Sequence, residues 1–266
     1  MTIRPDGSEY EIVSAGSVIG RAAVHPDGGL TWNFLEDVDE RLAVRGLDAM
    51  IEYAFGELGV HRVQGRLPAD AKHDLRIAAR AGLRKEGVVR GGGVEQADLV
   101  QFARVATDPP LADRSTFTAV LNSSLPTKRC IAQAIVRDEE GRILLCELVY
   151  KRFWDLPGGV VDPHESPATA VVRELREELD VEATVRGLAA VSWLPPWRGW
   201  DDATLFVFDV ELDRPPHSLQ PREIKAVHWV DPADLGEHVA EYTVRVIEQA
   251  LAADVPVYLE DGRPRV

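Results

Sequence analysis

Apolar positions in the first hundred residues change between the period of two expected of strands and the period of three to four expected of helices. The stretch YEIVSAGSVIGRAAVH predicts two strands around a turn at Ala15–Ser17. Further along, glycines at 59 and 82 end two amphipathic stretches. The predicted elements after the first hairpin are a helix over 41–58, a strand over 61–68, a helix over 71–82 and a strand over 99–106. This order predicts a mixed α/β domain.

The second half of the chain is richer in strand-like alternation. CIAQAIVRDEEGRILLCELV, residues 130–149, predicts a hairpin that turns at Asp138–Gly141. The remaining predicted elements are a helix after Ser166, strands over 184–194, 203–212 and 225–230, and a last helix over 240–253. One helix across a mostly β body and another at its end favour an α+β or sandwich arrangement.

A compositional break separates the two halves. Residues 106–129 gather Pro, Ser, Thr and Asn without a sustained hydrophobic period, which is typical of a connection. We therefore predict an N-terminal domain over 1–108, a linker over 109–128 and a C-terminal domain over 129–266.

Composition and charge restrict the classes of partner. Hydrophobic residues make up 45% and charged residues 28% of the 266, as in globular proteins, and no apolar run reaches the length of a membrane span. We expect a cytoplasmic protein with no membrane partner, in which Cys130 and Cys146 are buried thiols. The formal net charge of −14 argues against a nucleic-acid polymer as partner. An acidic protein that handles a polyanion would need divalent metal as a bridge.

The helix after Ser166 carries the clearest chemical signal. Ser166 is a suitable N-cap and Pro167 a suitable first helical residue. Glu174, Glu177 and Glu178 then fall in one narrow arc at 100° per residue. Like charges at these spacings repel, and bound divalent cations such as Mg²⁺ relieve that repulsion. The alternative is a solvated acidic helix with accidental spacing.

This segment resembles the signature of the Nudix hydrolases. The family pattern is Gly, five residues, Glu, seven residues, and then Arg-Glu-aliphatic-x-Glu-Glu-x-Gly-aliphatic. The matching positions are Gly159, Glu165, Arg173, Glu174, Leu175, Glu177, Glu178 and Val181. Asp180 stands where the family usually has Gly, and Asp tolerates left-handed backbone better than most residues. The resemblance covers roughly residues 128–260 and implies an α/β/α sandwich.

The resemblance also implies roles. Glu174, Glu177 and Glu178, with the carbonyl of Gly158, would ligate Mg²⁺ or Mn²⁺. The implied catalytic set adds Arg173, which would orient a carboxylate, and Glu165, which would support the loop or assist metal binding. The base that activates water stays open, because in this family it comes from this motif or from another loop. The implied activity is hydrolysis of a nucleoside diphosphate linked to another moiety, with ADP-ribose or a nucleoside diphosphate sugar favoured, and the family suggests a homodimer.

Aromatic residues suggest where the substrate binds. Trp154, Trp197 and Trp200 could stack on a nucleobase, and Arg198 could meet a phosphate. The alternative is that these residues fill a loop while Trp193 ends a strand in the core. Two interpretations stay open for three acidic residues. Asp201 and Asp202 are either a metal ligand or base, or solvated surface residues. Glu223 has either a catalytic role or a structural hydrogen-bonding role.

The first domain resembles a degenerate GNAT acetyltransferase over residues 9–108. In that family a Gly-rich loop before a helix binds the pyrophosphate of acetyl-CoA through backbone N–H groups. The corresponding segment here, Val38–Arg45, has no glycine and includes Asp39 and Glu40, which would repel phosphate. The family's Asn and Ser near the next helix are Ala71 and Asp74, and the chain begins too late for the usual first elements. We expect a structural or dimer-forming remnant.

Two alternatives to a simple hydrolase stay open. One is a bifunctional protein that also acetylates an amine, against which the glycine-free loop argues. The other is a non-catalytic nucleotide sensor, against which the three intact glutamates argue.

Overall fold

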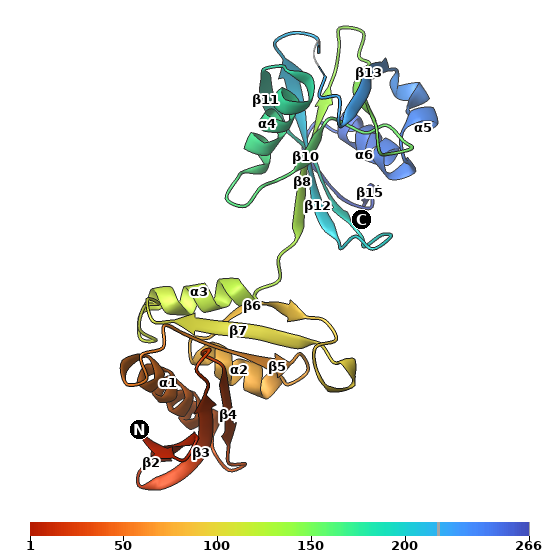
Figure 1. Cartoon of the computed structure of the whole chain (residues 1–266). Coiled ribbons are helices and arrows are strands. Elements are labelled where there is room, and N and C mark those ends of the chain that lie inside the picture. The colour runs from red at the N-terminus through yellow and green to blue at the C-terminus, as the bar shows by residue number, and fades with distance from the viewer. Residues whose placement is uncertain (217–218, 266) are drawn as a thin grey trace. The chain divides into compact units, whose positions relative to one another are not determined.

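The structure, a computed structural model, describes residues 1–216 and 219–265. The chain divides into two compact units, Met1–Pro126 and Thr127–Val266 (Figure 1). Both mix helices with sheets, as the sequence pattern predicts.

The first unit contains two antiparallel sheets. One has the order β1 (Thr2–Asp6), β2 (Glu9–Ser14), β3 (Ser17–Val24) and β4 (Leu30–Phe34). The other has the order β5 (Arg62–Pro68), β7 (Leu99–Val105) and β6 (Arg84–Val89). A single parallel bridge between Gly29 and Gln64 connects β4 to β5. The predicted mixed α/β domain is therefore built on two antiparallel sheets that this bridge joins.

Three helices cover these sheets. They are α1 (Glu40–Gly56), α2 (Lys72–Arg80) and α3 (Arg114–Ser124). Leu47, Met50 and Ile51 of α1 are fully buried, so this helix forms the centre of the first core, as its hydrophobic period predicts. The helix α3 corrects the sequence analysis, because it lies inside the predicted linker 109–128. Asp113 caps it by accepting from Ser115 N, and its own residues Thr116 and Val120 are buried.

The second unit is built on a six-stranded sheet with the order β10-β8-β12-β11-β14-β15. The strands are β8 (Arg129–Val136), β10 (Gly158–Val160), β11 (Ala183–Leu194), β12 (Ala203–Leu212), β14 (Val257–Glu260) and β15 (Arg263–Pro264). A separate two-stranded sheet pairs β9 (Ile143–Leu148) with β13 (Ile224–Val230). The turn of the hairpin predicted over 130–149 is present, but the pairing of its two strands is wrong. β8 and β9 share one bridge, between Arg137 and Ile143, and then join different sheets.

Alternation along the central strands builds a core on each face of this sheet. On β8, Ala132, Ala134 and Val136 join the core under α4 (Pro167–Leu179), while Ile131 and Ile135 join the opposite core. That opposite core contains residues of α5 (Leu235–His238), which follows the short turn η2 (Pro232–Asp234), and of α6 (Glu241–Ala252). Figure 1 shows α4 and α6 on opposite sides of the strands. The predicted α/β/α sandwich is confirmed.

Within the described residues, every helix is too short or too polar to cross a membrane.

Candidate active site

The helix α4 begins and ends as its sequence predicts. The Ser166 hydroxyl accepts a hydrogen bond from Thr169 N at 3.1 Å, and Pro167 occupies the first turn. Asp180 ends the helix in left-handed backbone with φ 52°. The register of the glutamates on α4 is thus fixed at both ends, and the Gly-to-Asp departure is accommodated.

Arg173 is the centre of the carboxylate cluster on α4. Its Nε and Nη2 donate to Glu165 at 3.0 and 2.9 Å, and its Nη1 donates to Glu174 at 2.9 Å and to Glu177 at 3.2 Å. Nη2 also donates to the carbonyl of Val160 on β10 at 3.2 Å. The hydrogen bonds to Glu165 and, second, to Glu174 raise the pKa of Arg173, and the contact with Arg173 lowers the pKa of Glu165. The contacts suit the predicted orienting role of Arg173.

Glu178 and Glu174 turn toward β10. The Glu178 carboxylate accepts from Gly158 N at 3.0 Å, and only 6% of the residue is exposed. Burial raises the pKa of Glu178 to about 8 and, to a lesser extent, the pKa of Glu174. A Cβ atom on Gly159 would lie 2.5 Å from a Glu174 oxygen, so a side chain there would displace the Glu174 carboxylate where β10 passes α4.

The carboxylates fit a hard divalent cation chemically, because a buried carboxylate is stabilised in its charged form by a nearby positive charge. In this structure, however, Glu174 points to Arg173 and Glu178 to Gly158 N. No group of three or more His, Cys, Asp or Glu side chains among the described residues forms a site that could hold a metal ion. The metal assignment to Gly158, Glu174, Glu177 and Glu178 stays a prediction.

The pKa of Glu178 predicts a pH-dependent stability for the metal-free protein. Because the folded-state pKa is about 8 and the ordinary value is 4.5, the contribution of Glu178 to stability is fully present below about pH 4.5 and is lost as the pH rises through about 8. Glu178→Gln keeps an acceptor for Gly158 N without the charge. In EDTA, we expect its melting temperature to exceed that of the wild type by a margin that grows from pH 5 to pH 8. A margin that does not change with pH would contradict the assigned pKa.

Trp197, Arg198 and Trp200 lie at the tip of the β11–β12 hairpin. Trp197 and Trp200 exchange backbone hydrogen bonds of 3.0 and 2.9 Å around Arg198 and Gly199, which both have positive φ. Both indoles are 62% exposed, with the Arg198 guanidinium 4.4 Å from the Trp197 ring and that of Arg129 4.6 Å from the Trp200 ring. Their exposure suits the predicted stacking role.

Asp202 connects this tip to Trp193 and Lys128. Its carboxylate accepts from Trp193 Nε1 at 2.8 Å and pairs with Lys128. The hydrogen bonds from Lys128 and Trp193 lower the pKa of Asp202. Asp202 is predicted either as a ligand or base or as a solvated surface residue, but these contacts give it a structural role instead.

Trp154 is enclosed on both faces. Its indole stacks on His228 at 3.9 Å and on His238 at 4.2 Å between ring centroids, each within 4° of parallel. A nucleobase could stack on Trp154 only if one imidazole moved away. The substrate-binding role predicted for Trp154 is therefore not favoured by this geometry.

Comparison with known proteins agrees with the motif on α4. The model of the NUDIX domain matches residues 127–250. A MutT-like protein of Streptomyces ambofaciens is 30% identical over 137 residues, which cover 50% of this chain and 83% of that protein. The chain belongs to the Nudix family. A protein of Bacillus subtilis (strain 168), named a putative 8-oxo-dGTP diphosphatase, is 34% identical over 133 residues, 49% of this chain and 87% of that protein. The prediction of a Nudix pyrophosphohydrolase is confirmed at the level of the family and enzyme class.

The GNAT resemblance of the first unit has weaker support. A crystal structure of a GNAT-family acetyltransferase from Bacillus anthracis covers 37% of this chain and 66% of its own, with 18% identity and a TM-score of 0.34. A likeness at this level carries no argument, and the acetyltransferase ancestry stays a prediction.

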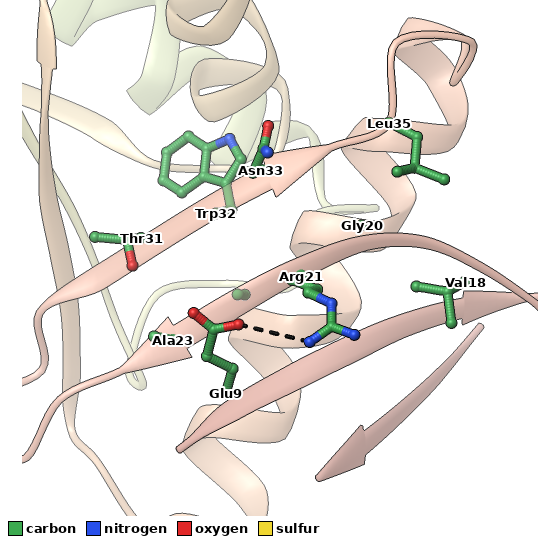
Figure 2. A pocket seen from close by; sticks show the side chains of 10 residues that line it. Glu9, Val18, Gly20, Arg21, Ala23, Thr31, Trp32, Asn33 and Leu35 are labelled. Carbon is green, nitrogen blue, oxygen red and sulfur yellow. Dashed lines mark ion pairs between the residues drawn. The ribbon is translucent and has the colours of Figure 1, made fainter. Parts of the chain in front are cut away.

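The first unit carries a hollow of about 310 Å³ on the outer face of its four-stranded sheet (Figure 2). Small side chains such as Ala23 and Thr31 leave this space between longer neighbours. Arg21 beside it is already paired with carboxylates, at 2.6 Å to Asp6, 3.2 Å to Glu11 and 3.9 Å to Glu9. Because three carboxylates surround its guanidinium, Arg21 is poorly suited to bind a phosphate.

The sequence analysis did not identify Asp155, a buried carboxylate connected through Gln133 to the strand that contacts Glu178. The Asp155 carboxylate, in a residue only 6% exposed, accepts from Lys151 Nζ at 2.8 Å and from Gln133 Nε2 at 3.0 Å. Gln133 on β8 pairs with Gly158 on β10, whose N–H binds Glu178. The signal that could have revealed this loop is the run VYKRF, residues 149–153, which interleaves two cations with aromatic residues in an acidic chain.

Proposed function

We propose that the second unit is a Mg²⁺-dependent hydrolase that cleaves the pyrophosphate bond of a nucleoside diphosphate linked to another moiety. The observation that carries the proposal is the cluster around Arg173, which gathers Glu165, Glu174 and Glu177 next to β10. Mn²⁺ would serve as an alternative ion, because the same oxygen donors suit both cations.

The groups that would hold the ion are the carboxylates of Glu174, Glu177 and Glu178 and the carbonyl of Gly158. A bound divalent cation supplies Lewis-acid polarisation of a phosphoryl oxygen and lowers the pKa of water. Arg173 holds Glu174 and Glu177 in orientation and anchors Glu165 by two hydrogen bonds. Glu178, whose pKa lies near 8 without a cation, would lose its proton when it binds the ion, because a nearby positive charge favours the carboxylate.

The substrate would bind at the tip of the β11–β12 hairpin. A nucleobase would stack on Trp197 or Trp200, and Arg198 would contact a phosphate. Arg129, which lies over Trp200, is two residues along β8 from Ile131, the partner of Val160 on β10. Two strand residues span about 7 Å. An extended nucleoside diphosphate derivative could therefore reach from the tip toward the carboxylates.

A second substrate class follows from the Bacillus subtilis relative, whose name specifies a nucleoside triphosphate. Product analysis by anion-exchange chromatography separates the two classes. With ADP-ribose or a nucleoside diphosphate sugar, the proposal expects a nucleoside monophosphate and a sugar phosphate. A nucleoside monophosphate with pyrophosphate, from triphosphates alone, would assign the second class instead.

The first unit would not catalyse acetyl transfer. Asp39 caps α1 by accepting from Leu42 N at 3.0 Å, and Glu40 in the first turn pairs with Arg80. Carboxylates thus occupy the helix N-terminus at which a cofactor pyrophosphate would bind. We expect acetyl-CoA to leave the melting temperature unchanged, whereas a ligand of the native state would raise it with concentration. A concentration-dependent rise would support the bifunctional alternative.

The expected homodimer and cytoplasmic location also belong to the proposal. Light scattering of the purified chain tests the former, and cell fractionation tests the latter.

A further inference from the structure

The loop between β9 and β10 is held firmly at both of its ends. Val149 N donates to the carbonyl of Glu223 at 3.0 Å. Cys146 and Asp155 exchange backbone hydrogen bonds of 2.8 and 3.0 Å across the base of the loop. Trp154, between His228 and His238, fixes the returning segment. The residues between these anchors are therefore presented in a defined position.

Those residues expose aromatic rings beside positive charges. Tyr150 is 66% exposed and Phe153 is 42% exposed. Lys151 Nζ lies 5.9 Å from the centre of the Tyr150 ring, and the Arg152 guanidinium lies 5.3 Å from that of Phe153. In a chain of net charge −14, two consecutive cations among aromatic side chains form a local surface suited to a phosphorylated aromatic ligand.

This loop adjoins the carboxylate site through a short series of contacts. Lys151 binds Asp155, Asp155 binds Gln133, and Gln133 pairs with Gly158, whose N–H donates to Glu178. Burial is the largest cause that raises the pKa of the Tyr150 phenol. The charge of Lys151 lowers this pKa, and the nearby charges of Glu178 and Glu223 raise it further. Tyr150 thus lies at the edge of the site on which the proposed function depends.

We propose that Tyr150 is a specificity-determining residue whose ring, in place of Trp197 or Trp200, stacks on the base of a nucleotide substrate, while the ammonium of Lys151, in place of Arg198, contacts its phosphates. This inference rests on the proposed function. An ammonium has three N–H donors, and Asp155 uses one of the three on Lys151. Trp154 is less suited to the stacking role, because imidazoles cover both of its faces.

The test is calorimetric titration of the full chain with α,β-methylene-ADP in Mg²⁺ buffer. The variants are Tyr150→Ala, Tyr150→Phe, which keeps the ring, and the control Tyr258→Ala, which removes a tyrosine that is 54% exposed on β14. Loss of base stacking is expected to weaken binding roughly 10-fold in Tyr150→Ala. Tyr150→Phe and Tyr258→Ala should bind like the wild type, and the melting temperature of each variant verifies its fold.

Equal binding by Tyr150→Ala and the wild type would overturn the inference, and so would an absence of binding by the wild type. Binding by a wild type that hydrolyses nothing, with the loss in Tyr150→Ala, would support the inference while refuting the proposed hydrolase. The two claims can therefore fail separately.

Discussion

The Glu177→Gln variant is expected to lose Mg²⁺-dependent hydrolysis by roughly 100-fold or more while it melts at nearly the same temperature as the wild type. The substitution removes one charge from the proposed cation ligands. The Glu177 side chain is 59% exposed, and its described ion pair is a 3.2 Å contact with Arg173. An exposed pair of this kind contributes about 0–1 kcal/mol to stability. Steady-state hydrolysis with a melting curve checks both halves of the expectation.

Glu182→Gln is the matched control for this experiment. Glu182 is 60% exposed and pairs with Arg176, so the substitution removes an equally exposed carboxylate from an arginine on the same helix, outside the proposed ligand set. We expect its activity to match the wild type. Near-wild-type turnover in Glu177→Gln, or an equal loss in both variants, would contradict the assignment of Glu177.

The Gly158→Ala variant is expected to lose both stability and activity. Gly158 has φ 129°, and a Cβ atom there would lie 2.2 Å from the carbonyl oxygen of Ala132 on β8. Backbone strain together with this overlap is expected to lower the free energy of unfolding by about 3 kcal/mol. Because Gly158 N binds Glu178, displacement of β10 would also disturb the carboxylate site. Urea denaturation and the hydrolysis assay measure the two effects.

Gly187→Ala provides the comparison. Gly187 lies on β11, its φ is not positive, and a Cβ atom would meet no heavy atom within 4 Å. At such a position Gly→Ala changes stability by at most about 1 kcal/mol, in the stabilising direction where the backbone is compatible. If Gly158→Ala were as stable as Gly187→Ala, the described backbone of β10 would be incorrect.

Much of the second unit could be predicted because its signals are local. The cap at Ser166, the proline after it and the left-handed Asp180 define α4 from neighbouring residues alone. The apolar segments that form β8 and β12 likewise predicted strands, and the structure buries these strands on both faces. The motif on α4 then supplied the candidate site.

The errors arose where distant partners decide the structure. β8 and β9 look like a hairpin in sequence, but β12 and β13, much later in the chain, pair with them separately. Trp154 looked available for a substrate because His228 and His238, which cover it, come from the far β13–α5 region. The helix α3 was missed because its hydrophobic period is weak and it buries few residues, Thr116 and Val120 among them.

The central claim is that the glutamates of α4 form a divalent-cation site for the hydrolysis of nucleotides. Its most direct test is the release of nucleoside monophosphate, measured by anion-exchange chromatography, from a panel of ADP-ribose, nucleoside diphosphate sugars, dinucleotides and nucleoside triphosphates. The account predicts release by the wild type with Mg²⁺ or Mn²⁺ that disappears in EDTA and in Glu177→Gln. Release that persists in EDTA, or that is equal in Glu177→Gln, would contradict it.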